Sequence, residues 1–209
     1  IKEIKLPLPP IEVQQQIVDE LEGYQKIIDG CRQVVENYKP TIDIDPSWEM
    51  VELDDEIDFV SGVTLSVPKS EDPNGIPIIT MADISEDGDL NLTKLRKVDV
   101  GKKSVNFCKK GDLLFNWRNG STHLVGKTAM VEESDKYIFA SFCQGIRVKD
   151  RLDSTYLWMI LNQYRRKGVY KRLMRQMVNG LFNREEIKIL EVPIPPIETQ
   201  RELVIRYQE

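Results

Sequence analysis

A proline-rich motif that occurs twice, once near each end, constrains this chain more than any other feature of its sequence. Residues 7–14 read Pro-Leu-Pro-Pro-Ile-Glu-Val-Gln, and residues 193–200 read Pro-Ile-Pro-Pro-Ile-Glu-Thr-Gln. The longer segments 1–23 and 187–209 align with each other without gaps. An internal repeat of this kind predicts two structurally equivalent units with most of the chain between them.

The chemistry of the repeated motif predicts a helix start. Each proline fixes its own φ and pushes the residue before it out of the α region, so the motif begins extended. Pro10 and Pro196 then suit the first turn of a helix, and the helix dipole favours a negative charge at Glu12 and Glu198. A proline-rich ligand for an aromatic groove is the alternative, but a docking peptide does not need an attached helix.

Apolar residues recur after the first motif with alternating spacings of four and three, which is the pattern of a coiled-coil seam. The seam residues are Ile17, Leu21, Tyr24, Ile28, Cys31, Val35 and Tyr38. They predict a helix over residues 11–38, in a spacer segment 11–40 that Pro40 ends, packed on another long helix. The candidate contacts to a helix of a partner protein, or to a second copy in a homodimer, are Ile17, Leu21, Tyr24, Ile28 and Val35. Packing of the helix on its own globular domain is the alternative.

The middle of the chain combines short β-like runs with turn clusters and few helices. The runs cover residues 49–53, 76–79, 112–116, 128–131, 137–142 and 145–149, and the turns cover residues 72–75, 86–89 and 118–121. This pattern predicts an α+β fold, with a mixed, mostly β domain over residues 45–195. The long helix and the start of a second helix, at residues 196–209, would flank it. Residues 1–10 would end a preceding domain, and residues 41–46 read as a polar linker.

Helix signals lie towards the end of this domain. Asp153 is a predicted N-cap, and Gly168 is expected to break or bend the helix that follows. Asn183 with Glu186 predicts a short capped helix before the second proline motif. The apolar residues Leu157, Leu161 and Tyr164 of the first of these helices are expected in the core.

The sequence lacks the residues and motifs of the common catalytic sites. Its cysteines are Cys31, Cys108 and Cys143 and its one histidine is His123, so neither a disulfide framework nor a multi-histidine metal site is expected. The motifs GxSxG, GxxxxGK[ST] and GxGxxG are absent. We therefore expect a non-catalytic protein that holds no cofactor and no metal.

The sequence also indicates where the protein works. No apolar run approaches the ~18 residues of a membrane span, and the N-terminal residues lack the pattern of an export signal. With few and scattered cysteines, this predicts a cytoplasmic protein without a membrane partner. The chain starts at Ile1 and not at a methionine, which favours a piece of a longer protein.

Charge is distributed unevenly along the chain. The formal net charge is −5, yet residues 154–184 contain no Asp or Glu. The basic residues of this stretch are Arg165, Arg166, Lys167, Lys171, Arg172, Arg175 and Arg184. A basic stretch on an acidic protein is a footprint of nucleic-acid binding. Candidate phosphate contacts are therefore Arg165, Arg166, Lys171, Arg172 and Arg175, with a merely solvated helix face as the alternative.

A polar loop follows the apolar run at residues 113–115. It brings together Asn116, Arg118, Asn119, Ser121, Thr122 and His123. Asn, Arg and His are residue types that read base edges, while Ser and Thr commonly hold phosphates. These residues, with Asn179 of the turn Asn179-Gly180, are the other candidate DNA contacts, whereas Trp117 is expected to be a packing anchor. The alternative is a hairpin loop whose polar side chains cap one another.

Together, these motifs resemble the specificity (S) subunits of type I restriction-modification enzymes. In that family a target recognition domain is followed by a signature like Ile-Pro-Leu-Pro-Pro-x-x-x-Gln that opens a long helix, and the arrangement occurs twice. Residues 6–14 and 192–200 fit this signature. Three further family elements are similar to Val-Ser-Gly-Val-Thr at residues 60–64, Gly-Ile-Pro-Ile-Ile-Thr-Met-Ala-Asp at residues 75–83 and Lys-Gly-Asp-Leu-Leu at residues 110–114. The chain departs from the family where Val63 replaces a second glycine and at residues 177–180, where a polar loop is usual.

The resemblance covers essentially the whole chain, as about half of such a subunit. It implies sequence-specific recognition of duplex DNA, with long helices that set the spacing between two recognition domains and dock methyltransferase (M) subunits. Through them the chain would reach the restriction (R) subunit, and catalysis would belong to these partners. The alternative from another functional class is a helical assembly or scaffold module without direct DNA contact. A fused methyltransferase is not expected, because an Asn/Asp-Pro-Pro-Tyr-like motif is absent.

Overall fold

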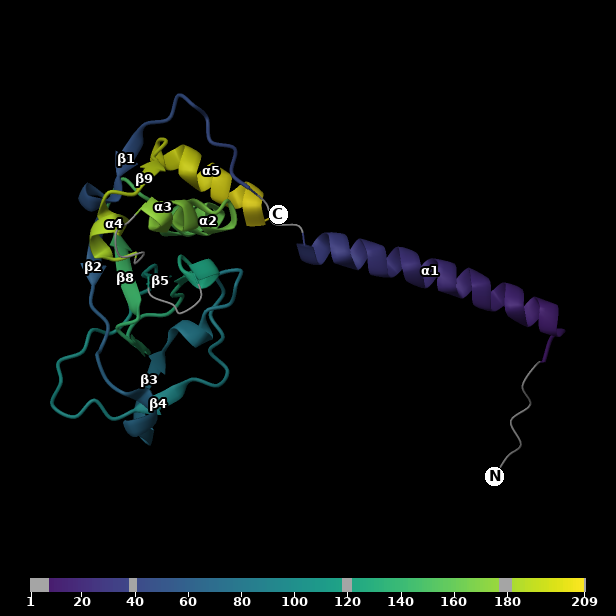
Figure 1. The fold of residues 1–209 in the computed structure, drawn as a ribbon, viewed down its shortest axis with the longest axis horizontal. Coiled ribbons are helices and arrows are strands. Elements are labelled where there is room, and N and C mark those ends of the chain that lie inside the picture. Colours follow the sequence, from purple (N-terminus) through teal and green to yellow (C-terminus); the bar gives the residue numbers. More distant parts are fainter. Residues whose placement is uncertain (1–7, 38–40, 118–121, 177–181, 209) are drawn as a thin grey trace. The chain divides into compact units, whose positions relative to one another are not determined.

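The computed structural model of the protein describes residues 8–37, 41–117, 122–176 and 182–208. It divides into a helical unit, Ile1–Thr41, and a globular unit, Ile42–Glu209 (Figure 1). The predicted α+β fold, with a long helix and a mixed domain, is confirmed.

The helical unit consists of one long helix, α1 (Ile11–Asn37). It begins where the prolines end, and the carbonyl of Pro10 accepts the backbone N–H groups of Val13 and Gln14 at 3.0 and 3.1 Å. This start agrees with the prediction, and the helix runs to Asn37, with Tyr38 outside the described residues. The seam residues Ile17, Leu21, Tyr24 and Ile28 are all exposed on its surface.

Three small sheets organise the globular unit. The first pairs β1 (Met50–Glu52) with β9 (Glu191–Pro193), antiparallel. The second is antiparallel, in the order β2 (Ile57–Val60), β8 (Cys143–Val148), β5 (Leu113–Asn116), β6 (Thr128–Met130). In the third, β3 (Glu71–Ile79) lies between antiparallel β4 (Arg96–Val98) and parallel β7 (Ile138–Phe139). Short 3-10 turns are η1 (Leu53–Asp55), η2 (Val67–Lys69), η3 (Met81–Asp83) and η4 (Thr122–Leu124).

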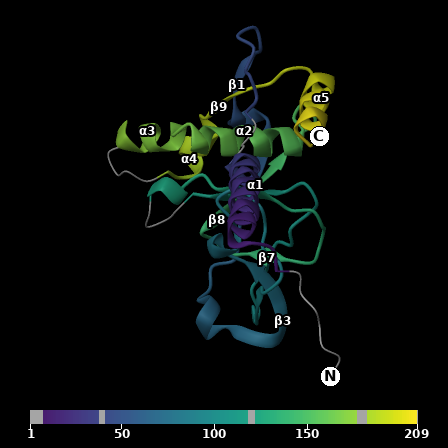
Figure 2. The ribbon, with the colours of Figure 1, turned by 90° about the vertical axis from the view of Figure 1, so that its right-hand side faces the viewer.

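The helices gather at one end of the globular unit. They are α2 (Ser154–Arg166), α3 (Val169–Gln176), α4 (Arg184–Lys188) and α5 (Ile197–Gln208). Figure 1 shows them near β1 and β9, with β3 and β4 at the opposite end of the unit and β2, β5 and β8 between. Figure 2 shows α2 and α3 end to end. Gly168, at φ +70°, separates them in the left-handed conformation that glycine adopts readily, as predicted.

An aromatic cluster fixes α3 and the segment before α4 against the second sheet. The rings of Phe115, Tyr170 and Phe182 lie 5.3–5.7 Å apart, two of the three pairs edge-to-face. Aromatic pairs in this geometry add stability beyond the area they bury. Gly126, at φ +88°, lies so close to the Tyr170 ring that an added Cβ would be 2.1 Å from it, so this position requires glycine.

The local helix signals read from the sequence are confirmed. The Asp153 carboxylate caps α2 by accepting the backbone N–H groups of Thr155 and Tyr156. Asn183 and Glu186 form a full capping box at the start of α4. The side chains predicted to be core, Leu157, Leu161 and Tyr164, are buried.

Two of the predicted loops are integrated into the globular unit. The turn predicted at residues 72–75 lies inside β3, where Glu71 and Ile76 both pair with Val98 and the residues between them bulge. Gly75 marks a close approach of two backbones there, since an added Cβ would lie 2.4 Å from Val98. The start of the predicted linker is held in the core, because the N–H and C=O of buried Ile42 both hydrogen-bond the Gln163 amide.

Candidate nucleic-acid interface

The basic stretch forms the outer side of α3. Tyr170 and Met174, one helical turn apart, are buried and fix the orientation of the helix. Lys171, Arg172 and Arg175 are exposed on the other side. The Arg172 guanidinium donates from Nη1 to the Lys167 carbonyl at 2.8 Å. Three cations on one short helix face present a compact positive surface, which we call the α3 basic face.

Arg165 has a different environment from the α3 basic face. Its guanidinium donates to the carbonyl of Glu86, in the predicted turn at residues 86–89, and the side chain is half-buried. That turn carries the exposed carboxylates of Glu86, Asp87 and Asp89. Nearby acids offset positive charge, so Arg165 and its exposed neighbour Arg166 are weaker candidates for phosphate contact than the α3 basic face.

Asn116, the first residue of the predicted polar loop, is not available for DNA contact. It belongs to β5 and its exposed fraction is 0%. The backbone N–H donates to the Lys127 carbonyl at 2.8 Å, and the side chain donates from Nδ2 to the Leu124 carbonyl at 3.1 Å. Asn116 therefore closes the base of the loop, and we withdraw it from the candidate contacts.

The remaining loop candidates are described only in part. His123 is exposed on η4, and Thr122 begins the same turn. Arg118, Asn119, Ser121 and Asn179 lie outside the described residues. Trp117 is half-buried against the core, and its Nε1 donates to the Ser141 carbonyl at 3.1 Å, as expected for a packing anchor.

Hydrogen bonds bring together a second polar surface that the sequence analysis missed. Asn106 donates from Nδ2 to the Ser61 carbonyl at 3.1 Å, and Lys103 donates from Nζ to the Thr64 carbonyl. Arg184 donates to the buried Gln144 amide oxygen at 3.1 and 3.2 Å and lies 3.4 Å from the Ser61 hydroxyl. We call the exposed residues of these segments the loop surface: Ser61, Thr64, Lys103, Asn106, Phe142 and Arg184.

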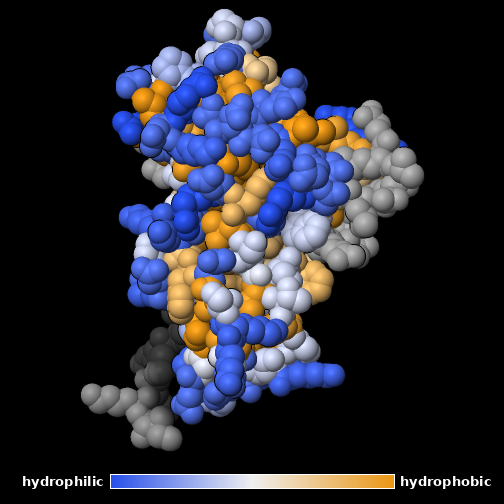
Figure 3. Space-filling view, turned by 90° about the vertical axis from the view of Figure 1, so that its left-hand side faces the viewer, coloured by the Kyte–Doolittle hydropathy of each residue, from blue (hydrophilic) through white to orange (hydrophobic). Residues whose placement is uncertain are grey.

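Three of the segments that build the loop surface contain no acidic residue, whereas Arg184 is followed directly by the exposed Glu185. Residues 61–70, 100–111 and 136–149 contain no Asp or Glu. They contain Lys69, Lys102, Lys103, Lys109, Lys110, Lys136, Arg147 and Lys149. Lys136, Arg147 and Lys149 form ion pairs with Glu133, Asp112 and Asp58, so the lysines of residues 61–70 and 100–111 supply the charge that favours an anionic partner. The absence of acids in these segments, like that in residues 154–184, was visible in the sequence. On the face shown in Figure 3, hydrophobic residues lie among hydrophilic ones.

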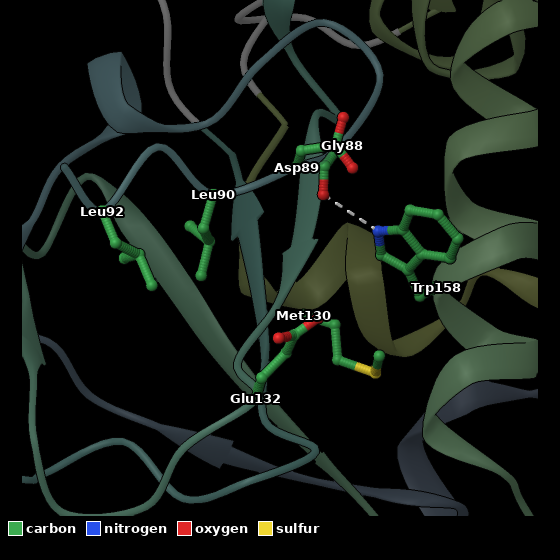
Figure 4. A pocket seen from close by; sticks show the side chains of 7 residues that line it. All are labelled: Gly88, Asp89, Leu90, Leu92, Met130, Glu132 and Trp158. Carbon is green, nitrogen blue, oxygen red and sulfur yellow. Dashed lines mark hydrogen bonds between the residues drawn. The ribbon is translucent and has the colours of Figure 1, made fainter.

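The small pocket beside α2 has the opposite electrostatic character. It has a volume of about 230 Å³ and is lined by Gly88, Asp89, Leu90, Leu92, Met130, Glu132 and Trp158 (Figure 4). The Trp158 indole closes one side by donating to the Gly88 carbonyl at 3.1 Å. The exposed carboxylates of Asp89 and Glu132 disfavour phosphate groups, so the pocket does not extend the candidate interface.

Within the described parts of the chain, His, Cys, Asp and Glu form no group that could hold a metal ion. Among the described helices, none is both long and apolar enough to cross a membrane.

Comparison with known proteins identifies the family. Residues 46–206, most of the globular unit, match the family described as the type I restriction modification DNA specificity domain. The chain belongs to this family, and the resemblance seen in the sequence motifs is confirmed. A curated relative, described as the type I restriction enzyme MjaX specificity subunit of Methanocaldococcus jannaschii, is 28% identical over 180 residues. That alignment covers 80% of this chain and 41% of the relative.

Solved structures share the fold. The HsdS subunit from Thermoanaerobacter tengcongensis matches with a TM-score of 0.59 at 20% identity, covering 97% of this chain and 51% of that one. A type I restriction-modification S subunit from M. genitalium matches with a TM-score of 0.54 at 13% identity, covering 78% and 39%. The chain thus spans about half the length of these proteins or less.

Proposed function

We propose that the globular unit reads a DNA sequence and directs the other subunits of a type I restriction-modification complex to it, without catalysis of its own. The observation that carries this proposal is the family match over residues 46–206, because it falls on the unit that bears both cationic surfaces. The acid-free sequence of these surfaces supports the proposal independently of the match.

The two surfaces have different roles in this proposal. The α3 basic face holds phosphates, which fixes the register of the protein on the duplex without reading sequence. The loop surface offers amide, hydroxyl and guanidinium groups, which are the groups that distinguish base edges. Hydrogen bonds between loops hold Ser61, Asn106 and Arg184 in place before DNA arrives, so less conformational entropy is lost on binding.

The helical unit serves as the spacer and as the dock for methyltransferase subunits in our proposal. Equivalent residues of the repeat differ in exposure: Leu8 is 83% exposed, whereas its counterpart Ile194, packed in the globular unit, is 6% exposed. The apolar surface before α5 is therefore buried in the globular unit, whereas the equivalent surface before α1 is exposed. A second recognition domain of this fold would cover it, and the exposed seam from Ile17 to Ile28 would bind another long helix. Through the methyltransferase subunits the complex recruits the restriction subunit.

A scaffold without DNA contact is the competing function, and the exposed seam of α1 favours it. A homodimer through the same seam is a further arrangement. The test is a DNA mobility-shift assay on the chain, on its methyltransferase subunit and on their co-purified complex. Sequence-dependent retardation by the complex but not by the methyltransferase subunit alone supports DNA recognition. Equal retardation with and without the chain would favour the scaffold.

A further inference from the structure

Phe142 is the one large apolar side chain that the loop surface, as defined above, exposes. Its exposed fraction is 48%, although its neighbours Ala140 and Cys143 are buried at 5% and 2%. Single exposed hydrophobic residues are common on proteins, so exposure alone does not assign a role. The backbone around Phe142 and the charges beside it supply the further observations.

The turn that carries Phe142 is held on both sides. The Cys143 N–H donates to the Ala140 carbonyl at 2.9 Å, which closes the turn around residues 141 and 142. Ser141 donates its N–H to the Val63 carbonyl at 3.0 Å and accepts the Trp117 indole N–H at 3.1 Å. The Phe142 ring is thus presented outward from a fixed backbone, between the buried strands β7 and β8.

The rest of the loop surface indicates what would cover this ring. Lys103 and Arg184 are the cations of the loop surface, and the segment that carries Phe142, residues 136–149, has no acidic residue. Ser61 and Asn106 add hydrogen-bonding groups. Cations and hydrogen-bonding groups on the same surface as an apolar ring suit a polyanion with apolar faces inside, and duplex DNA has phosphates outside and stacked bases within.

We propose that Phe142 is a specificity-determining wedge that inserts at a base-pair step of the target duplex. Apolar side chains inserted in this way partly unstack the bases and kink the DNA, which favours target sequences that deform easily. The inference rests on the proposed function, because it assumes that the globular unit binds DNA. It adds an apolar contact to the phosphate and base-edge contacts predicted from the sequence.

The test uses the complex of the full chain with its methyltransferase subunits and a duplex selected from random sequences by that complex. Phe142→Ala should weaken binding to the selected duplex by about tenfold or more, since base–aromatic contacts are worth about 1–3 kcal/mol. Binding to a shuffled duplex should change by less than about twofold. Phe142→Leu should restore part of the loss, because an aliphatic side chain can also act as a wedge.

A structural readout separates the wedge from a simple contact. With 2-aminopurine placed at each position in turn, the wild-type complex should raise fluorescence at one step, and Phe142→Ala should abolish the rise. Ile189→Ala, at another exposed apolar residue of the unit (62% exposed), is the matched control and should leave both readouts unchanged. Wild-type affinity and fluorescence in Phe142→Ala would overturn the wedge alone. A wild-type complex that does not prefer the selected duplex would overturn the proposed function, and the wedge with it.

Discussion

Asp112 and Arg147 form an ion pair with two hydrogen bonds, which fastens the turn before β5 to β8. Arg147 donates from Nε and Nη2 to the two carboxylate oxygens at 2.7 and 2.8 Å, and this bonding raises the pKa of Arg147. Asp112, 2% exposed, also accepts the Lys109 N–H at 2.7 Å. The Lys-Gly-Asp-Leu-Leu element at residues 110–114 therefore has a structural role.

Asp112→Asn should destabilise the globular unit by about 2 kcal/mol, because hydrogen bonds to charged groups are worth about 1.5–3 kcal/mol. Urea unfolding followed by tryptophan fluorescence measures this, since Trp48, Trp117 and Trp158 all lie in that unit. Asp58→Asn is the control: its exposed ion pair with Lys149, at 3.9 Å, should contribute less than about 0.5 kcal/mol. Equal effects of the two substitutions would contradict the assigned role of Asp112.

The repeated glutamines should differ in their contribution to stability. Gln200, 0% exposed, donates to the carbonyls of Arg151 and Pro195 and accepts the Asp153 N–H at 2.8–2.9 Å. Gln14 is half-buried and donates to the Pro9 carbonyl at 2.7 Å. Gln200→Ala should cost about 2–3 kcal/mol, because it leaves buried backbone groups without partners. Gln14→Ala should change the free energy of unfolding of the globular unit by less than about 0.5 kcal/mol. A loss in Gln14→Ala as large as the loss in Gln200→Ala would contradict this difference between the two glutamines.

How far the sequence predicts this structure depends on the range of the interactions involved. The cap at Asp153, the break at Gly168 and the start of α1 follow from neighbouring residues, and all three are confirmed. Strands β2, β4 and β9 were missed because each is short and is stabilised by partners distant in sequence, such as β8 for β2.

The candidate interface shows the same limit. Asn116 ends the predicted β run at residues 112–116, and it is also a candidate DNA contact by sequence because it is polar and begins the polar loop. The strand does reach Asn116, whose backbone N–H donates to the Lys127 carbonyl, but tertiary packing buries its side chain. Ser61, Asn106 and Arg184 are far apart in the sequence and meet only through tertiary contacts. The absence of acids in their segments was the available signal.

Stability should fall in alkaline solution. Burial raises the pKa of Cys108 and of Cys143 from 9.0 to about 12. Below about pH 9 the thiols stay protonated in both the folded and the unfolded chain. Above about pH 9 the unfolded chain loses these protons first, so the free energy of unfolding falls from about pH 9 towards 12. Urea unfolding at about pH 8 and pH 10 should show a loss of about 1 kcal/mol per thiol. Cys108→Ala/Cys143→Ala should flatten this dependence, and an unchanged slope would contradict the assignment to the thiols.

Charge reversal on the α3 basic face should weaken DNA binding at every sequence. Lys171→Glu/Arg175→Glu should flatten the salt dependence of binding, lowering the slope of log K against log salt concentration by about 2. Lys26→Glu/Arg32→Glu changes the net charge equally on the exposed surface of α1 and is the control. Titrations of shuffled and selected duplexes at several salt concentrations measure the slope. If the α3 and α1 variants give the same slope, the α3 basic face does not contact DNA.

The seam of α1 should determine assembly and not the stability of the globular unit. Leu21→Glu/Ile28→Glu puts charges on the exposed apolar seam and should abolish co-purification with the methyltransferase subunit and any self-association. Gln15→Glu/Gln33→Glu adds the same charge on the other side of the helix and should have little effect. Assembly that survives the seam variant would show that another surface binds the partner.

Selection of bound sequences from random duplexes tests the central claim most directly. The complex of this chain with its methyltransferase subunit should enrich one sequence motif, and Phe142→Ala should weaken the enrichment. Replacement of residues 45–195 by the same region of another family member should change the motif while the methyltransferase subunit stays the same. A motif that follows the methyltransferase subunit, or no enrichment above the methyltransferase subunit alone, would contradict DNA sequence recognition by this chain.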